Sequence, residues 1–347
     1  MKYPKVCIII LNWNGLKDTL ECLESVYELD YRNFEVIVVD NGSQDESVSA
    51  IKRNFPDVIL IENKENLGFA GGNNVGIKFA IENGADFVFL LNNDTVVAPD
   101  TLARMVEAYD NLENAGFLGC KIYFYDRPNV IQHFGGEIMF EPVLYGRHIG
   151  DGDEDRGQFE YVQKCDYVTG CAVFASRSVI DRVGVLDERY FAYWEDADWG
   201  MRANRLGLNN YVIPAAKVWH KVSSSLDGGS HPLRYYFIAR NRLLFASKFE
   251  SYIPGLRDSA SRAIDEEREK LTRTGYWLRK TAARALKEGI KDFQNNKFEG
   301  PPKWLKKNKK EFHEFKIHFL KNNLYESINK KIRHVIKQEW GKNHFRD

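Results

Sequence analysis

The first hundred residues alternate short, continuous apolar runs with longer stretches of helical periodicity. Runs rich in β-branched and aromatic residues predict buried strands, and the stretches between them predict amphipathic helices. In chain order these elements cover residues 6–11, 16–29, 34–39, 47–55, 58–61, 70–83 and 87–91. Alternation of strand and helix predicts a parallel sheet with helices on both faces. Ligands of such sheets bind beyond the carboxyl ends of the strands, so the chemistry is expected in the loops there.

The pattern changes after this region. Residues 116–174 carry shorter apolar runs broken by Gly, Pro and Asp, which predict irregular strands and a loop over the sheet. Beyond Pro232 the pattern is wholly helical, with a break at residues 300–302. The predicted elements of the second half are a helix at 195–206, short strands at 211–213 and 218–219, and helices at 233–249, 256–296 and 303–340.

Composition narrows the class of protein. The chain has 347 residues, 44% of them hydrophobic, which is enough for one large domain with an appendage. Its five cysteines form no C-x-x-C pair, which fits a reducing cytosolic compartment. No charged and apolar leader opens the chain, and no run approaches the roughly 18 apolar residues that span a bilayer, so neither export nor a membrane span is expected.

Charge is unevenly distributed although the formal net charge is zero. Residues 301–347 hold 13 Lys or Arg against 5 Asp or Glu, a balance of +8, so residues 1–300 carry −8. Apolar residues near helical spacing in this basic tail predict an amphipathic helix in peripheral contact with an anionic membrane. The alternative is a helix packed on the body of the chain or on a second subunit of a homodimer. No nucleic-acid partner is expected.

Two predicted strands end in acidic turns. The strand at 34–39 is followed by Asp40 and Asn-Gly-Ser, and a carboxylate there can accept hydrogen bonds from a base or a ribose hydroxyl. An ordinary turn that caps the next helix is the alternative. The strand at 87–91 is followed by Asn-Asn and Asp94, which together with a diphosphate could hold Mg²⁺ or Mn²⁺. A plain turn is again the alternative, and one carboxylate requires a second protein ligand elsewhere.

Residues 66–76, with the sequence NLGFAGGNNVG, form a glycine-rich loop that opens into a predicted helix. Free N–H groups at a helix N-terminus and close backbone approach suit a nucleotide or phosphate ligand. The spacing matches neither G-x-G-x-x-G nor the P-loop, which disfavours dinucleotide oxidoreductases and nucleotide triphosphatases. The alternative is tight packing of the helix on the sheet.

An aromatic run delivers three carboxylates to the predicted helix at 195–206. Trp194, Glu195 and Asp196 combine aromatic surface for a sugar ring with carboxylates that could deprotonate a sugar hydroxyl. Capping of the helix by the two acids is the alternative. Asp198 and Arg202 stand four residues apart and are predicted to pair on one helical face.

A histidine, His220, ends the second of the short predicted strands. Taken alone it fits a core or surface residue. Imidazole is a suitable partner for Mn²⁺, however, and the metal site predicted at Asp94 lacks a second ligand. The sequence therefore predicts that Asp94 and His220 share one cation.

Together these motifs resemble glycosyltransferase family 2, and within it the rhamnosyltransferase-like bacterial enzymes of cell-surface polysaccharide assembly. The resemblance covers residues 5 to about 250, and it rests on the order and spacing of motifs that are weak singly. They are residues 12–15 (NWNG), 39–43 (VDNGS), 66–73 (NLGFAGGN), 91–94 (LNND), 194–198 (WEDAD), His220 and 240–241 (RN).

The resemblance implies an α/β protein with a GT-A fold. A Rossmann-like, mostly parallel central sheet would be flanked by helices and followed by a C-terminal helical extension. The catalytic domain would span residues 1–250, with a donor half at about 1–115 and an acceptor half at about 116–230. Residues 251–347 would form the helical region with its basic tail.

The resemblance also implies roles for single residues. Asp196 is the expected general base, with Glu195 as second candidate, and Trp194 contacts the acceptor. Asp94 stands at the last position of the family's Asp-x-Asp metal motif, and His220 resembles its later metal-binding histidine. The implied donor-binding residues are Asn12, Asn14, Asp40, Asn41, Asn66, Gly68, Asn92, Asn93 and Arg240, the last beside the leaving diphosphate.

The implied reaction is a single displacement that inverts the anomeric centre, with a base that deprotonates the acceptor hydroxyl and Mn²⁺ or Mg²⁺ at the leaving diphosphate. Asn92 replaces the first Asp of the metal motif, which leaves the metal open. The first candidate donor is dTDP-L-rhamnose, and the expected acceptor is a glycan or a lipid-linked glycan. The expected location is the cytoplasm or the inner face of the cytoplasmic membrane. The alternatives are a UDP-hexose donor, a sugar-nucleotide pyrophosphorylase and a non-catalytic sugar-nucleotide-binding subunit.

Overall fold

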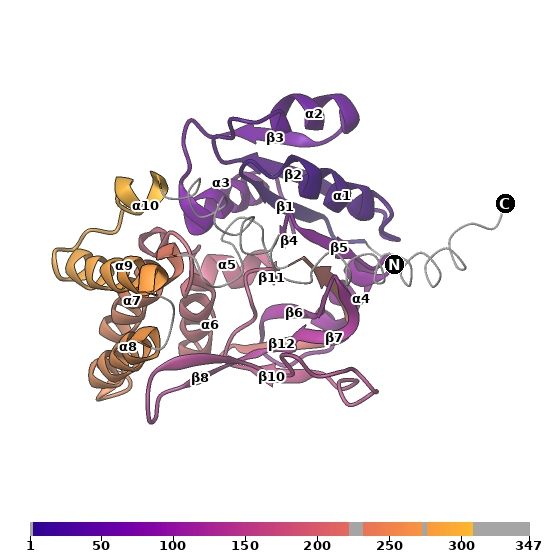
Figure 1. The fold of residues 1–347 in the computed structure, drawn as a ribbon. Coiled ribbons are helices and arrows are strands. Elements are labelled where there is room, and N and C mark those ends of the chain that lie inside the picture. The colour runs from indigo at the N-terminus through magenta and orange to yellow at the C-terminus, as the bar shows by residue number, and fades with distance from the viewer. Residues whose placement is uncertain (1–2, 222–231, 273–275, 308–347) are drawn as a thin grey trace. The chain divides into compact units, whose positions relative to one another are not determined.

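The computed structural model describes residues 3–221, 232–272 and 276–307 (Figure 1). The chain divides into two compact units, residues 1–300 and 301–347. These units divide at Gly300, and the catalytic domain at residues 1–250 stays a prediction. The second unit contributes one described helix, α10 (Lys303–Lys307), and the predicted membrane-contacting tail lies mostly in residues 308–347, outside the described residues.

A ten-stranded sheet forms the centre of the first unit. Its strands are β1 (Val6–Asn12), β2 (Phe34–Asp40), β3 (Ile59–Glu62), β4 (Phe87–Asn92), β5 (Thr95–Val97), β6 (Ala115–Phe124), β7 (Arg127–His133), β10 (Gln163–Cys165), β11 (Ala172–Ser176) and β12 (Asn209–His220). They follow the order β10-β12-β6-β11-β4-β1-β2-β3, with β5 paired to β12 and β7 to β6. The pairs that join β1 to β4, β1 to β2, β2 to β3 and β6 to β12 are parallel. A separate hairpin joins β8 (Gly136–Met139) to β9 (Tyr145–His148).

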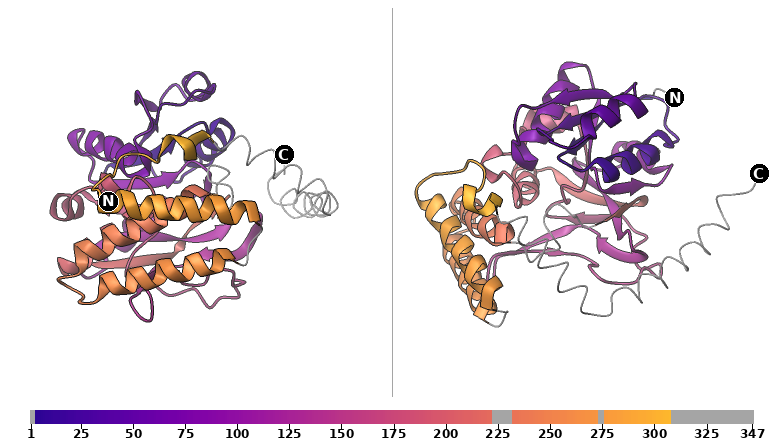
Figure 2. Two further views of the ribbon diagram at one scale, coloured as in Figure 1. Left: turned by 60° about the vertical axis from the view of Figure 1, so that its left-hand side comes forward. Right: turned by 45° about the horizontal axis from the view of Figure 1, so that its top comes forward.

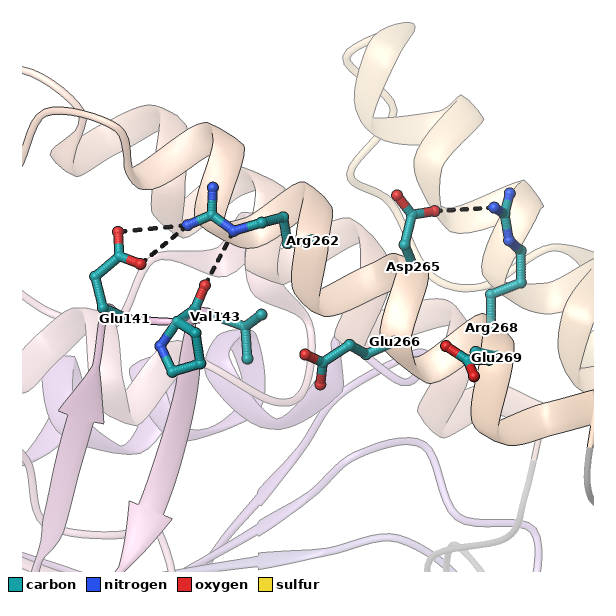
Figure 3. Close-up of a pocket in the computed structure, with 8 residues that line it drawn as sticks. Glu141, Val143, Arg262, Asp265, Glu266, Arg268 and Glu269 are labelled. Carbon is teal, nitrogen blue, oxygen red and sulfur yellow. Dashed lines mark hydrogen bonds and ion pairs between the residues drawn. The ribbon is translucent and has the colours of Figure 1, made fainter.

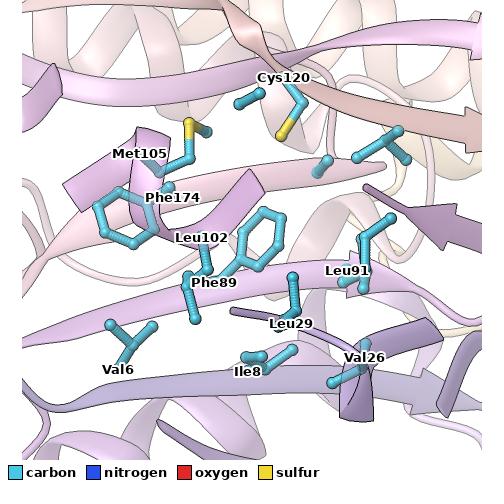
Figure 4. Packing of buried hydrophobic residues seen from close by; sticks show 14 of the residues in the cluster. Val6, Ile8, Val26, Leu29, Phe89, Leu91, Leu102, Met105, Cys120 and Phe174 are labelled. Atoms are coloured by element: carbon cyan, nitrogen blue, oxygen red, sulfur yellow. The ribbon is translucent and has the colours of Figure 1, made fainter. Parts of the chain in front are cut away.

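Helices cover both faces of the sheet, as predicted. They are α1 (Leu16–Tyr27), α2 (Ser47–Asn54), α3 (Gly68–Glu82), α4 (Thr101–Asp110), α5 (Arg177–Val183) and α6 (Glu195–Arg205). Beyond them the chain forms α7 (Pro232–Phe249), α8 (Leu256–Thr272) and α9 (Tyr276–Gln294), and a 3₁₀ turn η1 (Glu188–Tyr190) precedes α6. Successive side chains of a strand point to opposite faces. Accordingly Val6 and Ile8 pack in the cluster that includes Val26 of α1 and Leu102 and Met105 of α4 (Figure 4). Cys7 and Ile9 point to the other face, where they pack with α3, α5 and α6.

Two predictions for the middle of the chain are wrong. Residues 115–124 form the long, almost wholly buried strand β6 within the central sheet, where irregular strands and a loop were expected. The two short strands predicted near residues 211 and 218 are one strand, β12, because a register shift between Ile213 and Lys217 accommodates Pro214. The third difference lies at the C-terminal side, where α8 and α9 take the place of one predicted helix.

The order of the strands reverses at β1. The chain passes from β1 to β2 and β3 on one side, whereas β4 lies on the other side of β1. Ligands of such sheets bind at the carboxyl ends of the strands where this order reverses. At that edge the parallel register sets Asn12 beside Asp40 and Leu11 beside Asn92. Figures 1 and 2 show α7, α8 and α9 side by side, with α7 packed on both of the others.

Candidate active site

The structure brings the two predicted metal ligands together. Antiparallel pairing of β5 with β12 sets His220 opposite Thr95, the residue that follows Asp94. His220 Nε2 lies 3.1 Å from Asp94 Oδ1, and both side chains are largely buried. Residues 126 positions apart in the chain thus meet because an edge strand of three residues pairs with the end of β12.

Gln132, at the end of β7, fixes the orientation of the His220 ring. Its Oε1 lies 2.7 Å from His220 Nδ1, and an amide oxygen can only accept, so Nδ1 is the donor and Nε2 faces Asp94. Burial lowers the pKa of His220, but the neighbouring Cys171 and Asp94 outweigh burial and raise this pKa well above its ordinary value. No motif in the sequence marked Gln132, because its role depends on strand pairing.

The donor set of this pair fits a divalent cation. A carboxylate oxygen and an imidazole nitrogen held by an outer hydrogen bond are ligands that Mn²⁺ accepts. Over the described residues, no group of three His, Cys, Asp or Glu side chains is arranged to hold a metal. The protein therefore offers two ligands, and a diphosphate and water would supply the others.

Asp196, the predicted base, lies at the first turn of α6. Its Oδ2 accepts a hydrogen bond from the Gly170 N–H at 3.1 Å, and its Oδ1 accepts one from the Ala197 N–H at 2.8 Å. Its neighbour Glu195 is 6% exposed, and its Oε2 has no hydrogen-bond partner in the described part of the chain. Burial raises the pKa of both carboxyls, and it raises that of Glu195 well above its ordinary value. The N–H groups of Gly170 and Ala197 oppose the rise at Asp196.

One short segment connects the predicted base to the predicted metal ligands. Gly170 donates to Asp196, and the carbonyl of the next residue, Cys171, accepts from the Asn92 N–H at 2.9 Å. The Cys171 side chain lies beside His220. Consecutive Cα atoms are about 3.8 Å apart, so both groups lie at the same edge of the sheet.

The loop before Asp196 is strained. Phe191, Tyr193 and Trp194 have φ angles of 62°, 69° and 75°, in the left-handed region that non-glycine residues rarely adopt. Asn241 holds this loop, because its Nδ2 lies 2.7–2.9 Å from the carbonyl oxygens of Tyr190, Ala192 and Tyr193. Strain of this kind costs about 1–3 kcal/mol per residue and is concentrated at functional sites.

Replacing Asn241 with Ala is expected to lower the free energy of unfolding by about 2–3 kcal/mol, because buried carbonyls lose their donor. Chemical denaturation measures the change. Asn83→Ala is the matched control, since Asn83 donates to a single carbonyl in the exposed last turn of α3, and it should change stability by less than about 0.5 kcal/mol. If the two variants were equally stable, Asn241 would not be the residue that holds this loop in place.

Arg240 does not offer its charge to a ligand. The side chain has no exposed surface, and its guanidinium donates to the carbonyls of Arg189, Tyr190 and Glu299 and to Asn241 Oδ1. The expectation that Arg240 contacts the leaving diphosphate is therefore wrong for this structure. Arg240 and Asn241 instead bind backbone carbonyls, and the pair positions the loop that carries Trp194.

Two further side chains predicted to bind the donor are saturated by protein partners. Asn41 is buried, and its amide bonds Asn66 Oδ1, the Gly68 carbonyl, Asn63 Nδ2 and the Leu67 N–H. Those four hydrogen bonds use both N–H donors and both acceptor lone pairs of the Asn41 amide. Asn12 is likewise fully buried. Its amide bonds Asp40, Ser43, Gly15 and Thr19.

Asp40 is almost completely buried, and each of its oxygens accepts one hydrogen bond, from Asn12 Nδ2 and from the Ser43 N–H. Each oxygen keeps a lone pair for a ligand. Asn14, with a φ of 51°, is exposed at the rim of this edge. Asn92 and Asn93 are partly exposed at the end of β4, where Asn93 donates to Thr19. These four residues remain predicted donor contacts.

The glycine-rich segment serves packing and not phosphate binding. The N–H groups of Phe69 and Ala70 at the start of α3 donate to the Phe191 carbonyl, and the N–H of Gly68 donates to Asn66 Oδ1. The predicted free N–H groups are therefore occupied. A Cβ on Gly76 would lie 2.5 Å from a methyl group of Ile9 on β1, so glycine lets the helix approach the sheet.

Asp198 confirms the predicted structural pairing. It is fully buried and accepts from Arg202 Nε at 2.8 Å and from the Tyr190 hydroxyl at 3.1 Å. Lys248 of α7 completes the group. Asp198 thus joins α6, η1 and α7 and is not available for proton transfer.

A surface hollow of about 770 Å³ lies between residues 141–143 and α8 (Figure 3). Figure 3 shows that two of its arginines are paired, Arg262 with Glu141 and Arg268 with Asp265. None of the predicted site residues lines this hollow. The predicted site residues instead gather near the carboxyl ends of the strands.

Comparison with known proteins identifies the family and the fold. Residues 7–184 match the model of the family described as glycosyl transferase family 2. A mannosyltransferase of Pyrobaculum calidifontis, solved in complex with GDP-Man and Mn²⁺, superposes with a TM-score of 0.52 at 18% identity, over 86% of this chain and 89% of that chain. The fold is the GT-A fold of glycosyltransferases.

The sequence relatives have related names. The chain is 28% identical over 220 residues to the N-acetylglucosaminyl-diphospho-decaprenol L-rhamnosyltransferase of Mycobacterium tuberculosis, covering 58% of this chain and 71% of the relative. It is 26% identical over 250 residues to the dTDP-rhamnosyl transferase RfbF of Shigella flexneri, covering 69% and 79%. A third relative is the protein y4gI of Sinorhizobium fredii, which is 30% identical over 232 residues. This match covers 64% of this chain but only 25% of y4gI.

The chain belongs to glycosyl transferase family 2 and is a glycosyltransferase that uses nucleotide sugars. That membership is not consistent with the pyrophosphorylase or the non-catalytic alternative. No helix in the described parts of the chain has the length and apolarity to span a membrane.

Proposed function

We propose that the chain transfers a sugar from a nucleotide diphosphate to a hydroxyl of a glycan or lipid-linked glycan, with inversion at the anomeric carbon. The observation that supports the proposal is that Asp196 accepts from Gly170, while the next residue, Cys171, accepts from Asn92 and lies beside His220. A base at Asp196 and a cation held by Asp94 and His220 would then lie on either side of residues 170 and 171.

Asp196 would take the proton of the acceptor hydroxyl, since the hydrogen bonds from Gly170 and Ala197 favour its charged form. Trp194, held in place by the strained loop, would provide a surface for the acceptor ring. A cation on Asp94 and His220 would offset the negative charge that develops on the leaving diphosphate. Mn²⁺ is favoured over Mg²⁺ because the pair includes an imidazole nitrogen.

The first candidate donor is dTDP-L-rhamnose, because two relatives are named rhamnosyltransferases. UDP-hexoses are the second candidate, since a pocket for a pyrimidine does not by itself discriminate sugars. The cytoplasm is the expected location. Peripheral membrane contact and a homodimer remain predictions, and the tail that would mediate the contact lies mostly outside the described residues.

A panel of nucleotide sugars tests the proposal. We expect dTDP-L-rhamnose to raise the thermal midpoint of the protein and to be hydrolysed slowly to dTDP, only with Mn²⁺ or Mg²⁺ present. RT ln(1 + [L]/Kd) predicts about 2.7 kcal/mol of stabilisation at a hundredfold excess over Kd. If the protein preferred a UDP-hexose, the proposed donor would be wrong but the proposed reaction would stand. If no nucleotide sugar stabilised the protein or was hydrolysed, the proposal would be contradicted.

A further inference from the structure

The acceptor side contains a buried cation that the proposed reaction does not use. Arg242, on α7, follows Arg240 and Asn241 directly and is only 6% exposed. Its Nε and Nη1 have no hydrogen-bond partner among the residues that the structure describes. Buried polar groups in native proteins are nearly always paired, so two open N–H groups on one side chain require an explanation.

Arg242 lies next to the candidate acceptor site. Its Cζ is 5.8 Å from the centroid of the Trp194 ring, and Trp194 immediately precedes the two acids of α6. Arg234, two turns earlier on the same helix, is close enough to act on Arg242 as a second positive charge. It also acts on Tyr193, the neighbour of Trp194. The two cations therefore lie near one another and near the aromatic residues that precede Glu195.

Arg242 keeps its charge at neutral pH. Burial lowers its pKa to about 10, Glu267 opposes the shift and Arg234 adds to it. Glu266 acts in the same sense as Glu267, but neither carboxylate is within hydrogen-bond distance of the two open N–H groups. A charged, buried guanidinium with two N–H groups that lack acceptors is unfavourable, and a ligand that accepts from those groups lowers the penalty.

The geometry of a guanidinium selects the ligand. Its planar fork matches two oxygens of a phosphate, and such bidentate, charge-assisted bonds are stronger than bonds to neutral groups. The hydroxyls of a neutral sugar would leave the charge uncompensated. A second cation beside the first favours a group with more than one negative charge, such as a diphosphate.

We propose that Arg242, supported by Arg234, binds a phosphate group of the acceptor while Trp194 contacts the acceptor sugar. The inference rests on the proposed function and adds to it the class of acceptor, a sugar phosphate or diphosphate and not a neutral glycan. It assigns to the third residue of the Arg-Asn-Arg run a binding role, distinct from the positioning role of the first two.

Titration with inorganic pyrophosphate in EDTA tests the site. Wild type and the control Arg262→Met, which loses an exposed arginine of α8, should bind pyrophosphate equally. Arg242→Met should bind it at least about tenfold more weakly, since bonds to a charged group contribute about 1.5–3 kcal/mol. Unchanged binding by Arg242→Met would overturn the proposal.

Stability without ligand separates a binding role from a structural one. Because Arg242→Met removes an unpaired buried charge at similar volume, its thermal midpoint should equal or exceed that of wild type. A fall of several degrees would mean that Arg242 holds the fold, and the proposal would be wrong.

Nucleotide binding separates the acceptor phosphate from the donor phosphate. The affinities of dTDP and UDP, measured with Mn²⁺, should be unchanged in Arg242→Met. A tenfold loss would assign the anion to the donor diphosphate and overturn the proposal. If even wild type bound neither nucleotide, the proposed function would fail, whereas the pyrophosphate titration would still decide the role of Arg242.

Discussion

Replacing Asp196 with Asn is expected to lower kcat by about two to four orders of magnitude, because the amide cannot take the proton of the acceptor hydroxyl. The Kd of the donor, measured by calorimetry, should change by less than about twofold, since the side chain is held by Gly170 and Ala197 and not by a donor contact. Asp181→Asn, on the exposed side of α5, is the matched control and should retain full turnover.

The pH profile gives a second measure of the same base. Burial raises the pKa of Asp196, so the carboxyl is protonated and inactive over a wider acidic range than an ordinary aspartate. The ratio kcat/KM should therefore rise with pH through a value above 3.8, the ordinary value for Asp, and then level off. If Glu195→Gln abolished turnover and Asp196→Asn did not, Glu195 would be the base.

Asp94→Asn and His220→Gln are each expected to reduce Mn²⁺-dependent turnover by about 10²–10³. Loss of the cation removes several kcal/mol of stabilisation from the charge on the leaving diphosphate, and each 1.4 kcal/mol is a factor of ten. EDTA should lower the turnover of the wild-type enzyme to a similar rate, and added Mn²⁺ should restore the full rate. Turnover by wild type in EDTA at the full rate would contradict the metal site.

Gln132→Leu should act through His220 and have a smaller effect. Removal of an outer hydrogen bond to a metal-binding histidine typically weakens metal affinity by about 10–100-fold. Free Mn²⁺ measured by paramagnetic resonance gives that affinity without an activity assay. Gln158→Leu, at an exposed loop position, is the control and should bind Mn²⁺ as wild type does.

Strong local patterns made the donor half of the fold predictable. The strands at 6–12, 34–40 and 87–92 are continuous apolar runs that end in polar residues, and the structure confirms them. Strand β12 was predicted as two pieces because Pro214 interrupts its pattern, and only pairing with β6 shows that one strand continues past it. Strand β6 was not predicted because glycines interrupt its apolar pattern. In the structure these glycines leave room for the neighbouring residues Asn209 and Val168.

The candidate site was predictable where a residue acts through its own chemistry. Asp94, His220 and Asp196 were identified by residue type and by position at element ends, and the structure brings the first two together. Arg240 and Asn41 were misjudged because their hydrogen-bond partners are backbone groups far away in the chain. Hydrogen-bond partners of that kind are set by tertiary packing, and the pattern of residues along the chain does not predict them.

The Phe191 carbonyl accepts hydrogen bonds from the first N–H groups of α3, a helix that begins beside the expected nucleotide site. The same loop ends in the turn that carries Asp196. The start of α3 and the turn that carries Asp196 are therefore linked through one backbone carbonyl, so a substitution that displaces the N-terminus of α3 is expected to displace the acid as well.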